Sequence, residues 1–506
     1  MRRGSGNGTS EPANDERPSE VTPAASFTSR LLGTPRSSLR PVLILVLAGL
    51  VSSCGWRRAD SVQPERQTAP IANPALDSGA DRSGDREDAD LEGKWRRARP
   101  DEPANASGEQ SLPNLRALPY LQGYRPAEDH PVVARIDPAA EQAGLNLYLS
   151  GHAAEAVLMD MDGRTLHTWR YPLRRLWPDL ARDPAMAKLE YWRRAYLFPN
   201  GDLLGIYEGQ GLVKLDARSH VLWSHRGGIH HDLEVAANGD VWVLDRDGKL
   251  IPRLNPSEGI LEDMITVLGP NGTVRRRISI LHAFERSRFR GLLARRPAAG
   301  DIFHTNTLEI LDGRFVARNP VLRKGNVLIS VLKLDTIAIL DPDREEIVWA
   351  ETGSFRRQHQ PTFLPDGHLL MFDNTGPGGD RSRVLEIDPF GASPNRVLWQ
   401  FGGRAGQELF SKTLGSCQRL GGGNTLITES ENGRALEIDR EGRVVWEFRN
   451  PHRAGARGEL VAVLFEMLRL PLDFPFPPGR GTIDDTSSRG TGRTAVAPRG
   501  GLAHRR

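Results

Sequence analysis

The chain has 506 residues, of which 38% are hydrophobic and 26% charged. A mean hydropathy of -0.44 excludes a polytopic membrane protein, and a net charge of +3 excludes a strongly basic nucleic-acid-binding protein. The 52 glycines and 36 prolines predict many turns, and two distant cysteines without a CxxC pair exclude a disulfide framework and a zinc ribbon.

Residues 1–53 have the pattern of a signal peptide. Ten uncharged residues, 42–51, follow three arginines and precede two serines and Cys54. They are too few to cross a hydrocarbon core, which needs about twenty, but they suit the apolar part of an export signal. The Val-Ser-Ser-Cys ending resembles a bacterial lipobox. It implies a lipid on Cys54 and a membrane-anchored protein on the periplasmic side of the bacterial cell envelope; an ordinary signal with an incidental cysteine is the alternative.

Residues 54–130 mix Pro, Ala, Ser, Gly and charges of both signs, with few β-branched or aromatic runs. Such a segment buries too little apolar surface to offset the entropy lost on ordering. We therefore expect a disordered linker that tethers a folded domain.

A repeated pattern fills residues 131–454. Each copy has an Asn-Gly or Asp-Gly turn, an apolar strand, a second strand that ends in Asp, another turn, and a strand that ends in Trp. Repeats of about 40 to 50 residues with four short strands are typical of β-propeller blades. The pattern predicts an all-β, six-bladed propeller of four-stranded antiparallel blades, with units that begin near residues 145, 194, 230, 303, 358 and 416.

Two inserts and the tail depart from this pattern. Residues 174–193 and 281–296 have helical spacing and lack strand alternation, so they predict short helices on the propeller. Within residues 455–506 the run ELVAVLFEMLRL predicts a helical patch, and the rest of this segment predicts a disordered tail.

Three histidines recur at one position of the repeat. His231 and His359 each lie eight residues before the glycine of the following turn, and His304 lies nine before its own. We expect the strand before this turn to be the innermost of its blade, so the three imidazoles should meet at the propeller centre. His230 should point away, because neighbours on a strand face opposite sides.

This arrangement leaves several functions open. The histidines could form a His₃ zinc site, a nucleophilic site, or a binding site without chemistry. They could also be polar caps or core residues that only stabilise the fold. Cys417 lies near the same position in the last blade, where a small buried residue is expected.

Four ordered motifs resemble the bacterial arylsulfotransferase family, which consists of six-bladed propellers of the periplasm. The resemblance covers about residues 145–455. The motifs are HHDLEVAANGDVWVL (230–244), DIFHTNTLEI (301–310), QHQPTFLPDGHLLMFDN (358–374) and NPHR (450–453).

The resemblance implies a sulfuryl transferase that uses an aryl sulfate donor and a phenolic acceptor, without a nucleotide donor or another cofactor. It implies a ping-pong route in which His359 becomes sulfated. His231 and His304 would hold the sulfuryl oxygens and assist proton transfer at the phenol oxygen. Asn306 and Asn374 are expected to contribute to substrate binding, and no metal is expected.

One position departs from the family pattern. The family normally has an arginine two residues after the serine of a Leu-Ile-Ser strand, where this chain has Leu332. Lys333 would face the other side of the strand expected over 327–340, and Arg323 or Arg356 would have to supply the charge from loops. Loss of one donor to a developing anion costs on the order of 3 kcal/mol. A propeller that binds a small anionic or aromatic ligand without turnover is therefore the main alternative, and a scaffold for envelope proteins is another.

Overall fold

The structure is a computed structural model that describes residues 123–475, apart from 181–189, 354, 392–395, 403–404 and 456. The predicted signal peptide with Cys54, most of the predicted linker, and the tail after residue 475 lie outside the described residues. Within the described residues, no helix is both long and apolar enough to span a bilayer.

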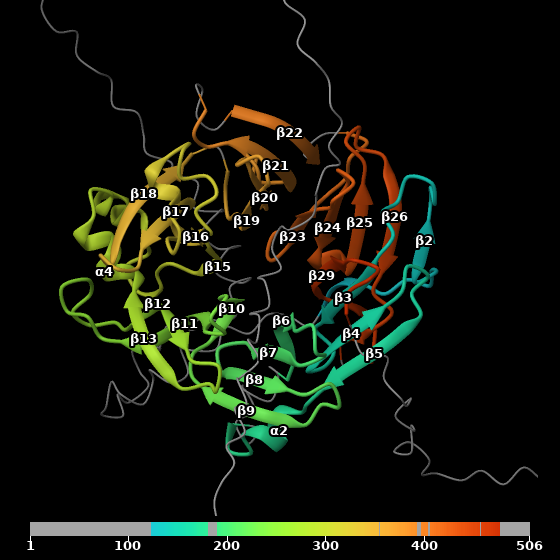
Figure 1. Ribbon diagram of the computed structural model, residues 1–506, viewed down its shortest axis with the longest axis horizontal. Coiled ribbons are helices and arrows are strands. Elements are labelled where there is room, and N and C mark those ends of the chain that lie inside the picture. Colours follow the sequence, from blue (N-terminus) through green and yellow to red (C-terminus); the bar gives the residue numbers. More distant parts are fainter. Residues whose placement is uncertain are drawn as a thin grey trace, which may run out of the picture. The chain divides into compact units, whose positions relative to one another are not determined.

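Six sheets, each built on four antiparallel strands and two of them with a fifth strand added, form the blades of a β-propeller, which confirms the predicted fold class (Figure 1). Blade 1 contains β29 (Leu464–Leu470), β3 (Leu145–Ser150), β4 (Glu155–Met159) and β5 (Thr165–Arg170). Blade 2 contains β6 (Trp192–Leu197), β7 (Leu203–Tyr207), β8 (Gly211–Leu215) and β9 (Val221–Arg226). Blade 3 contains β10 (His230–Val235), β11 (Val241–Lys249), β12 (Ile260–Leu268) and β13 (Val274–Ser279), and β14 (Gly300–Asp301) pairs with β12.

The remaining blades follow in chain order. Blade 4 contains β15 (Thr305–Ile310), β16 (Val327–Val331), β17 (Thr336–Asp341) and β18 (Glu346–Thr352). Blade 5 contains β19 (His359–Phe363), β20 (Leu369–Asp373), β21 (Arg383–Asp388) and β22 (Arg396–Gly402). Blade 6 contains β23 (Ser416–Arg419), β24 (Thr425–Glu429), β25 (Arg434–Ile438) and β26 (Val444–Arg449), and β2 (Val133–Arg135) pairs with β26.

The first-listed strand of each blade is its inner strand and lies nearest the common centre of the ring (Figure 1). The turns after several inner strands are built alike. In blades 3 and 5 the turn ends on a glycine with positive φ, Gly239 at 83° and Gly367 at 84°, where a side chain would be strained. This shared turn puts His231 and His359 at the same residue count, eight, before the glycine of their blades.

Six apolar clusters fill the spaces between neighbouring blades, one for each pair. In β3, for example, Leu147 and Leu149 pack toward blade 2, whereas Tyr148 packs toward blade 6. Because side chains alternate along a strand, both faces of such a strand must be apolar. Cys417 lies in the cluster between blades 5 and 6, where burial raises the pKa of its thiol to about 12, so it is an inert core residue.

The end of the chain corrects the predicted helical patch. Its residues form β28 (Leu460–Ala462) and β29, and β29 pairs with β3 to complete blade 1. A strand buried on both faces has no polar alternation, so its apolar run is easily mistaken for a buried helix. β28 also pairs with β27 (Arg453–Ala454) and with β1 (Gly123–Pro126), which lies inside the segment predicted to be a disordered linker.

Short helices occur in and beyond the predicted inserts. The second insert contains α4 (Ile280–Arg286) and η3 (Arg290–Arg295). Of the first insert, the structure describes one turn, α2 (Leu173–Leu176), and its last residues belong to β6. Further single turns are η4 (Pro320–Leu322), η5 (Leu332–Leu334) and η6 (Ser430–Asn432).

We expect Phe465→Ala to lower the free energy of unfolding by about 3 to 5 kcal/mol, because it removes a fully buried ring from the strand that closes the propeller. Phe465 stacks on Tyr191 of the neighbouring blade at 4.7 Å between ring centroids. Urea unfolding measures the change. The matched control is Leu472→Ala, at a side chain that is 68% exposed, which should change stability by no more than about 0.5 kcal/mol. Equal effects of the two variants would contradict the closing role of β29.

Candidate active site

The three predicted histidines lie where the inner strands of blades 3, 4 and 5 begin. His231 and His359 are buried and His304 is partly buried. The imidazoles of His231 and His304 meet edge to face, with ring centroids 4.7 Å apart. The charge of His304 also contributes to lowering the pKa of His359, after burial and the nearby charge of Arg193. The structure thus brings the rings of His231 and His304, 73 positions apart in the chain (304 minus 231), into contact.

Irregular backbone at these strand starts aims the side chains. The pairing register shifts where β10, β15 and β19 begin. His231, His304 and Gln360 have φ values of 54°, 50° and 49°. Positive φ is uncommon outside glycine, and bulges re-aim side chains. His230 was expected to point away from the other histidines, and this prediction is wrong. Because of the bulge in β10, His230 Nδ1 lies 2.8 Å from His231 Nδ1, and both rings are buried.

His359 is held in one tautomer. Its Nδ1 lies 2.7 Å from Asn374 Oδ1 and 3.0 Å from the Arg357 carbonyl oxygen. The amide nitrogen of Asn374 donates to the Ser411 and Leu414 carbonyls, which leaves the amide oxygen facing the imidazole. Two acceptors around Nδ1 require the proton on this atom, so the lone pair of neutral His359 lies on Nε2. Burial lowers the pKa of His359 to about 3, which keeps the ring neutral near pH 7.

His304 has a carboxylate partner. Its Nδ1 contacts Asp301 Oδ2, and its backbone N–H donates to Asp301 Oδ1 at 3.0 Å. The His304 charge and this hydrogen bond overcome the effect of burial and lower the pKa of Asp301. A carboxylate on one ring nitrogen orients the imidazole.

His231 lies beside a buried ion pair. Glu208 accepts the backbone N–H of His231 at 3.1 Å and also accepts from Arg246 Nη2 at 3.1 Å. Burial, followed by the charges of His304 and His230, lowers the pKa of His231 well below its usual value. Burial is also the main cause that lowers the pKa of His230, and the charge of Arg246 is the second. Both imidazoles are therefore neutral at pH 7.

Arg193 is the residue that the sequence analysis missed. It lies eight residues before Gly201, so it occupies in blade 2 the position that His231 and His359 occupy in blades 3 and 5. The register of β6 shifts between Trp192 and Arg194, and Arg193 is only 5% exposed. Its charge contributes to lowering the pKa of both His231 and His359. The same residue count that singled out the histidines would have found it.

Leu332 does not lie in a strand, as the sequence predicted, but in a single helical turn. The predicted strand over 327–340 is interrupted by η5, which contains the buried Leu332. The argument that Lys333 faces the other side of a strand therefore fails; its charge instead contributes to lowering the pKa of Asp301, after His304 and Arg246. Arg323 pairs with Asp341 and Asp343 at the far end of blade 4, and Arg356 is exposed.

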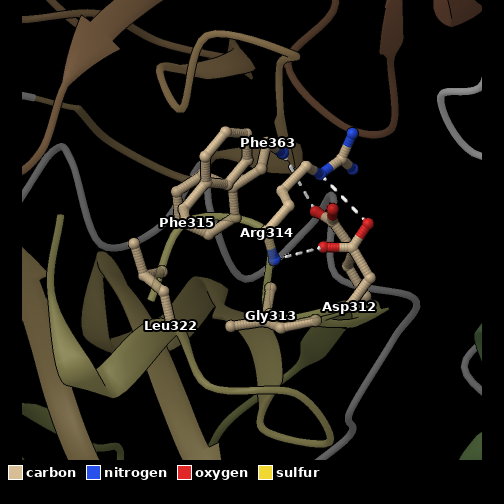
Figure 2. A pocket seen from close by; sticks show the side chains of 8 residues that line it. Asp312, Gly313, Arg314, Phe315, Leu322 and Phe363 are labelled. Atoms are coloured by element: carbon tan, nitrogen blue, oxygen red, sulfur yellow. Dashed lines mark hydrogen bonds and ion pairs between the residues drawn. The ribbon is translucent and has the colours of Figure 1, made fainter. Parts of the chain in front are cut away.

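A small hollow lies at the C-terminal end of β15, away from the histidines, and Figure 2 shows residues that line it. Its free volume is about 10 Å³, room for a single water. Arg314 pairs with Asp312 there, and Phe363 donates its backbone N–H to Glu309 at 3.0 Å. This hollow is too small for an aryl ligand.

The distances between possible ligand atoms show which residues of the cluster could bind a metal ion together. Glu208, His230 and His231 offer one ligand atom each within 4.8 Å of one another, whereas the three predicted histidines form no such set among the described residues. Arg246 places a positive charge on the same Glu208 carboxylate. A cation next to the ligand set disfavours a metal ion and favours an anion.

The depressed pKa of His359 predicts a contribution to acid sensitivity. Between pH 6.5 and about 3 the unfolded chain binds a proton on this imidazole and the folded protein does not, so stability falls as pH falls. We expect His359→Gln to make this dependence less steep by up to about 1.4 kcal/mol per pH unit. Urea unfolding at several pH values measures the slope. Above pH 7 the difference between the two proteins should be constant, and equal slopes below pH 6 would show that folded His359 is charged there.

Comparison with known proteins identifies the family to which this part of the chain belongs. Residues 200–451 match the model of a family described as arylsulfotransferase (ASST). Similar solved structures include a protein of unknown function from Bacteroides caccae, with 14% identity and a TM-score of 0.40 over 61% of this chain and 94% of that one. The WD40 β-propeller domain of Doa1 has 12% identity and a TM-score of 0.36 over 69% of this chain and 95% of that one. No curated protein matches the chain in sequence. Through residues 200–451, which contain all three histidines and Leu332, the chain belongs to the arylsulfotransferase family.

Proposed function

We propose that the protein transfers a sulfuryl group from an aryl sulfate to a phenolic acceptor, with His359 as the covalent nucleophile. The observation that carries this proposal is the bond between His359 Nδ1 and Asn374, because it leaves the Nε2 lone pair for attack. A neutral imidazole is a competent nucleophile near pH 7, and the family supports an aryl sulfate donor and a phenol acceptor.

In the first half-reaction, Nε2 of His359 attacks the sulfur atom, the N–S bond forms, and the bond between sulfur and the aryl oxygen breaks. Both electrons of that bond stay on the aryl oxygen, which takes a proton from the imidazolium of His304. Asp301 stabilises this imidazolium before the transfer. The sulfated ring keeps its Nδ1 proton on Asn374, so its positive charge balances the charge of the sulfonate.

In the second half-reaction, a phenol replaces the leaving product. His304 accepts the phenol proton, the phenol oxygen attacks sulfur, and the N–S bond breaks with its electrons returning to Nε2. The ring of His231 meets that of His304 edge to face, which supports the proposal that His231 donates to a sulfuryl oxygen. The same residues act in both half-reactions, as a ping-pong reaction requires.

The two asparagines predicted to bind substrate are better suited to positioning. Asn374 uses its oxygen on His359 and its nitrogen on two carbonyls. Asn306 donates to the Gln358 carbonyl at 2.9 Å and accepts from Thr307 at 3.1 Å. We therefore propose that both hold the start of β19, and with it His359, in place.

Incubation with 4-nitrophenyl sulfate should add about 80 Da to the protein, one sulfuryl group on His359. Intact-mass analysis followed by peptide mapping measures the adduct. His359→Ala should remove the adduct and the transfer to phenol, while His220→Ala, at a side chain 72% exposed, should leave both unchanged.

Transfer by His359→Ala at the wild-type rate would contradict the nucleophile assignment. A wild-type protein that binds the aryl sulfate without forming an adduct would favour the binding protein without turnover instead.

We also propose that Cys54 carries a lipid that anchors the protein in the bacterial cell envelope, on the basis of the lipobox-like Val-Ser-Ser-Cys ending. Expressed with its own leader in a bacterium, the wild type should partition into the detergent phase of a Triton X-114 extract, because acyl chains supply membrane affinity. Cys54→Ala should lose the acyl mass at this residue. A wild-type protein that is exported but carries no acyl group would contradict the anchor.

A further inference from the structure

Blade 3 extends beyond the other blades at the end of the ring that carries the histidines. Its middle strands, β11 and β12, have nine residues each, whereas the middle strands of the other blades have five or six. Leu244 of β11 pairs with His230, where the inner strand begins, and β11 continues to Lys249. In blade 2 the corresponding strand ends at Tyr207, level with the start of its inner strand. The hairpin over residues 245–263 therefore projects from the histidine-bearing end.

The insert after β13 packs against this hairpin. Arg253 of the hairpin donates from Nε and Nη2 to the two carboxylate oxygens of Glu285 in α4, at 2.9 and 2.8 Å. The insert then returns to the hairpin through β14, which pairs with β12. We call residues 245–263 and 280–300 the blade 3 extension.

This extension carries positive charge that no acid balances. Residues 286–300 contain no acidic residue but five arginines, namely Arg286, Arg288, Arg290, Arg295 and Arg296. The acid just before them, Glu285, is paired with Arg253. Within the part of the chain that the structure describes, none of the five arginines forms an ion pair, and the first three are exposed. An external anion would balance this charge.

Exposed arginines at the opposite end of the ring are neutralised. There, three turns between the third and fourth strands of a blade each carry an exposed arginine next to an acid. The ion pairs are Arg164–Asp160, Arg344–Glu346 and Arg443–Asp439. The unbalanced charge is therefore a property of the blade 3 extension and does not follow from the high arginine content of the chain.

The same extension exposes apolar side chains. Leu250 in the hairpin is 51% exposed, and Phe289 and Leu292 of the insert are only partly buried. Proteins that bind a membrane surface combine basic residues, which attract anionic lipids, with apolar side chains that enter the headgroup region. A dissolved anion would need only the basic residues. The combination therefore fits a lipid bilayer better than a soluble anion.

We propose that the blade 3 extension docks on an anionic phospholipid bilayer. Its arginines bind the lipid phosphates, and Leu250 enters the headgroup region. Docking turns the histidine-bearing end of the ring toward the membrane, because the extension projects from that end. This membrane contact is independent of the proposed sulfuryl transfer and of a lipid on Cys54.

Vesicle binding tests the arginines. Every protein carries Cys54→Ala, so that no acyl chain contributes, and is centrifuged with vesicles of phosphatidylcholine alone or mixed with phosphatidylglycerol. We expect binding to the mixed vesicles only, and its loss in about 1 M salt, where the Debye length is about 3 Å. Arg286→Gln, Arg288→Gln and Arg290→Gln together should weaken binding about 100-fold, since each arginine near an anionic surface contributes roughly fivefold.

A second triple variant is the matched control. Arg164→Gln, Arg344→Gln and Arg443→Gln together change the net charge by the same amount but lie at the opposite end of the ring. This variant should bind the mixed vesicles like the parent protein. Both triple variants alter exposed side chains, so both should keep the urea unfolding curve of the parent protein.

A fluorescent label tests contact with the bilayer itself. In the Cys54→Ala background the remaining cysteine is Cys417, which is buried and whose thiol pKa is raised to about 12, so it does not react. Leu250→Cys then accepts a polarity-sensitive dye at one position. Its emission should shift to the blue on the mixed vesicles, because the dye leaves water. The same dye at Leu166→Cys, on the outer strand of blade 1 where Leu166 is 40% exposed, should not shift.

Three results would overturn the proposal. The first is equal binding to both kinds of vesicle, or unchanged binding by the triple variant of the insert. The second is a blue shift at Leu166→Cys without one at Leu250→Cys, which would show contact through another face. The third is binding of soluble polyphosphate through these arginines without binding of the vesicles, which would identify a dissolved polyanion as the partner.

Discussion

Each inner strand of the propeller is an edge strand, and the backbone N–H groups on its free side must find acceptors at the centre of the ring. The preceding blade supplies them. Asp232 of blade 3 accepts from Leu308 of blade 4 at 2.9 Å, and Glu309 of blade 4 accepts from Phe363 of blade 5 at 3.0 Å. Such bonds set the height and rotation of one blade against the next, and therefore the distances between imidazoles that different blades carry.

The acceptors that join the blades are buried acids, and this has an electrostatic consequence. Burial raises the pKa of Glu234 and of Glu309 to about 8, from an ordinary 4.5. The folded protein therefore holds protons that the unfolded chain releases between these values, so these groups reduce stability as pH rises through that window. Buried histidines act in the opposite direction below pH 6.5. Between pH 4.5 and 6.5 the two windows overlap, so the carboxyl groups and the histidines have opposite effects on stability there.

Much of this architecture could be predicted because a repeat converts sequence position into spatial position. The predicted units begin within two residues of β3, β6, β10, β15, β19 and β23. The closing strand β29 could not be recognised, because it lacks a turn of its own and its partner β3 lies more than 300 residues away in sequence. Backbone detail was also out of reach: the bulge that turns His230 toward His231, and the turn η5 at Leu332, depend on pairing between strands. The hydrogen bond that His359 donates to Asn374 depends on two loop carbonyls that no motif identifies.

The ring also explains how a site can lose a charge from one blade and keep its electrostatics. Every blade presents a residue at the start of its inner strand, and these residues share one centre whatever their order in the chain. A cation is needed at a point in space, not at a point in the sequence, because Coulomb attraction depends only on separation and on the surrounding medium. Arg193 belongs to the inner strand of blade 2 and Leu332 lies in blade 4, so the residue at one of these positions does not by itself fix the charge of the cluster. Where equivalent positions converge, loss of a motif residue is therefore weak evidence for loss of function until the other blades have been read at the same position.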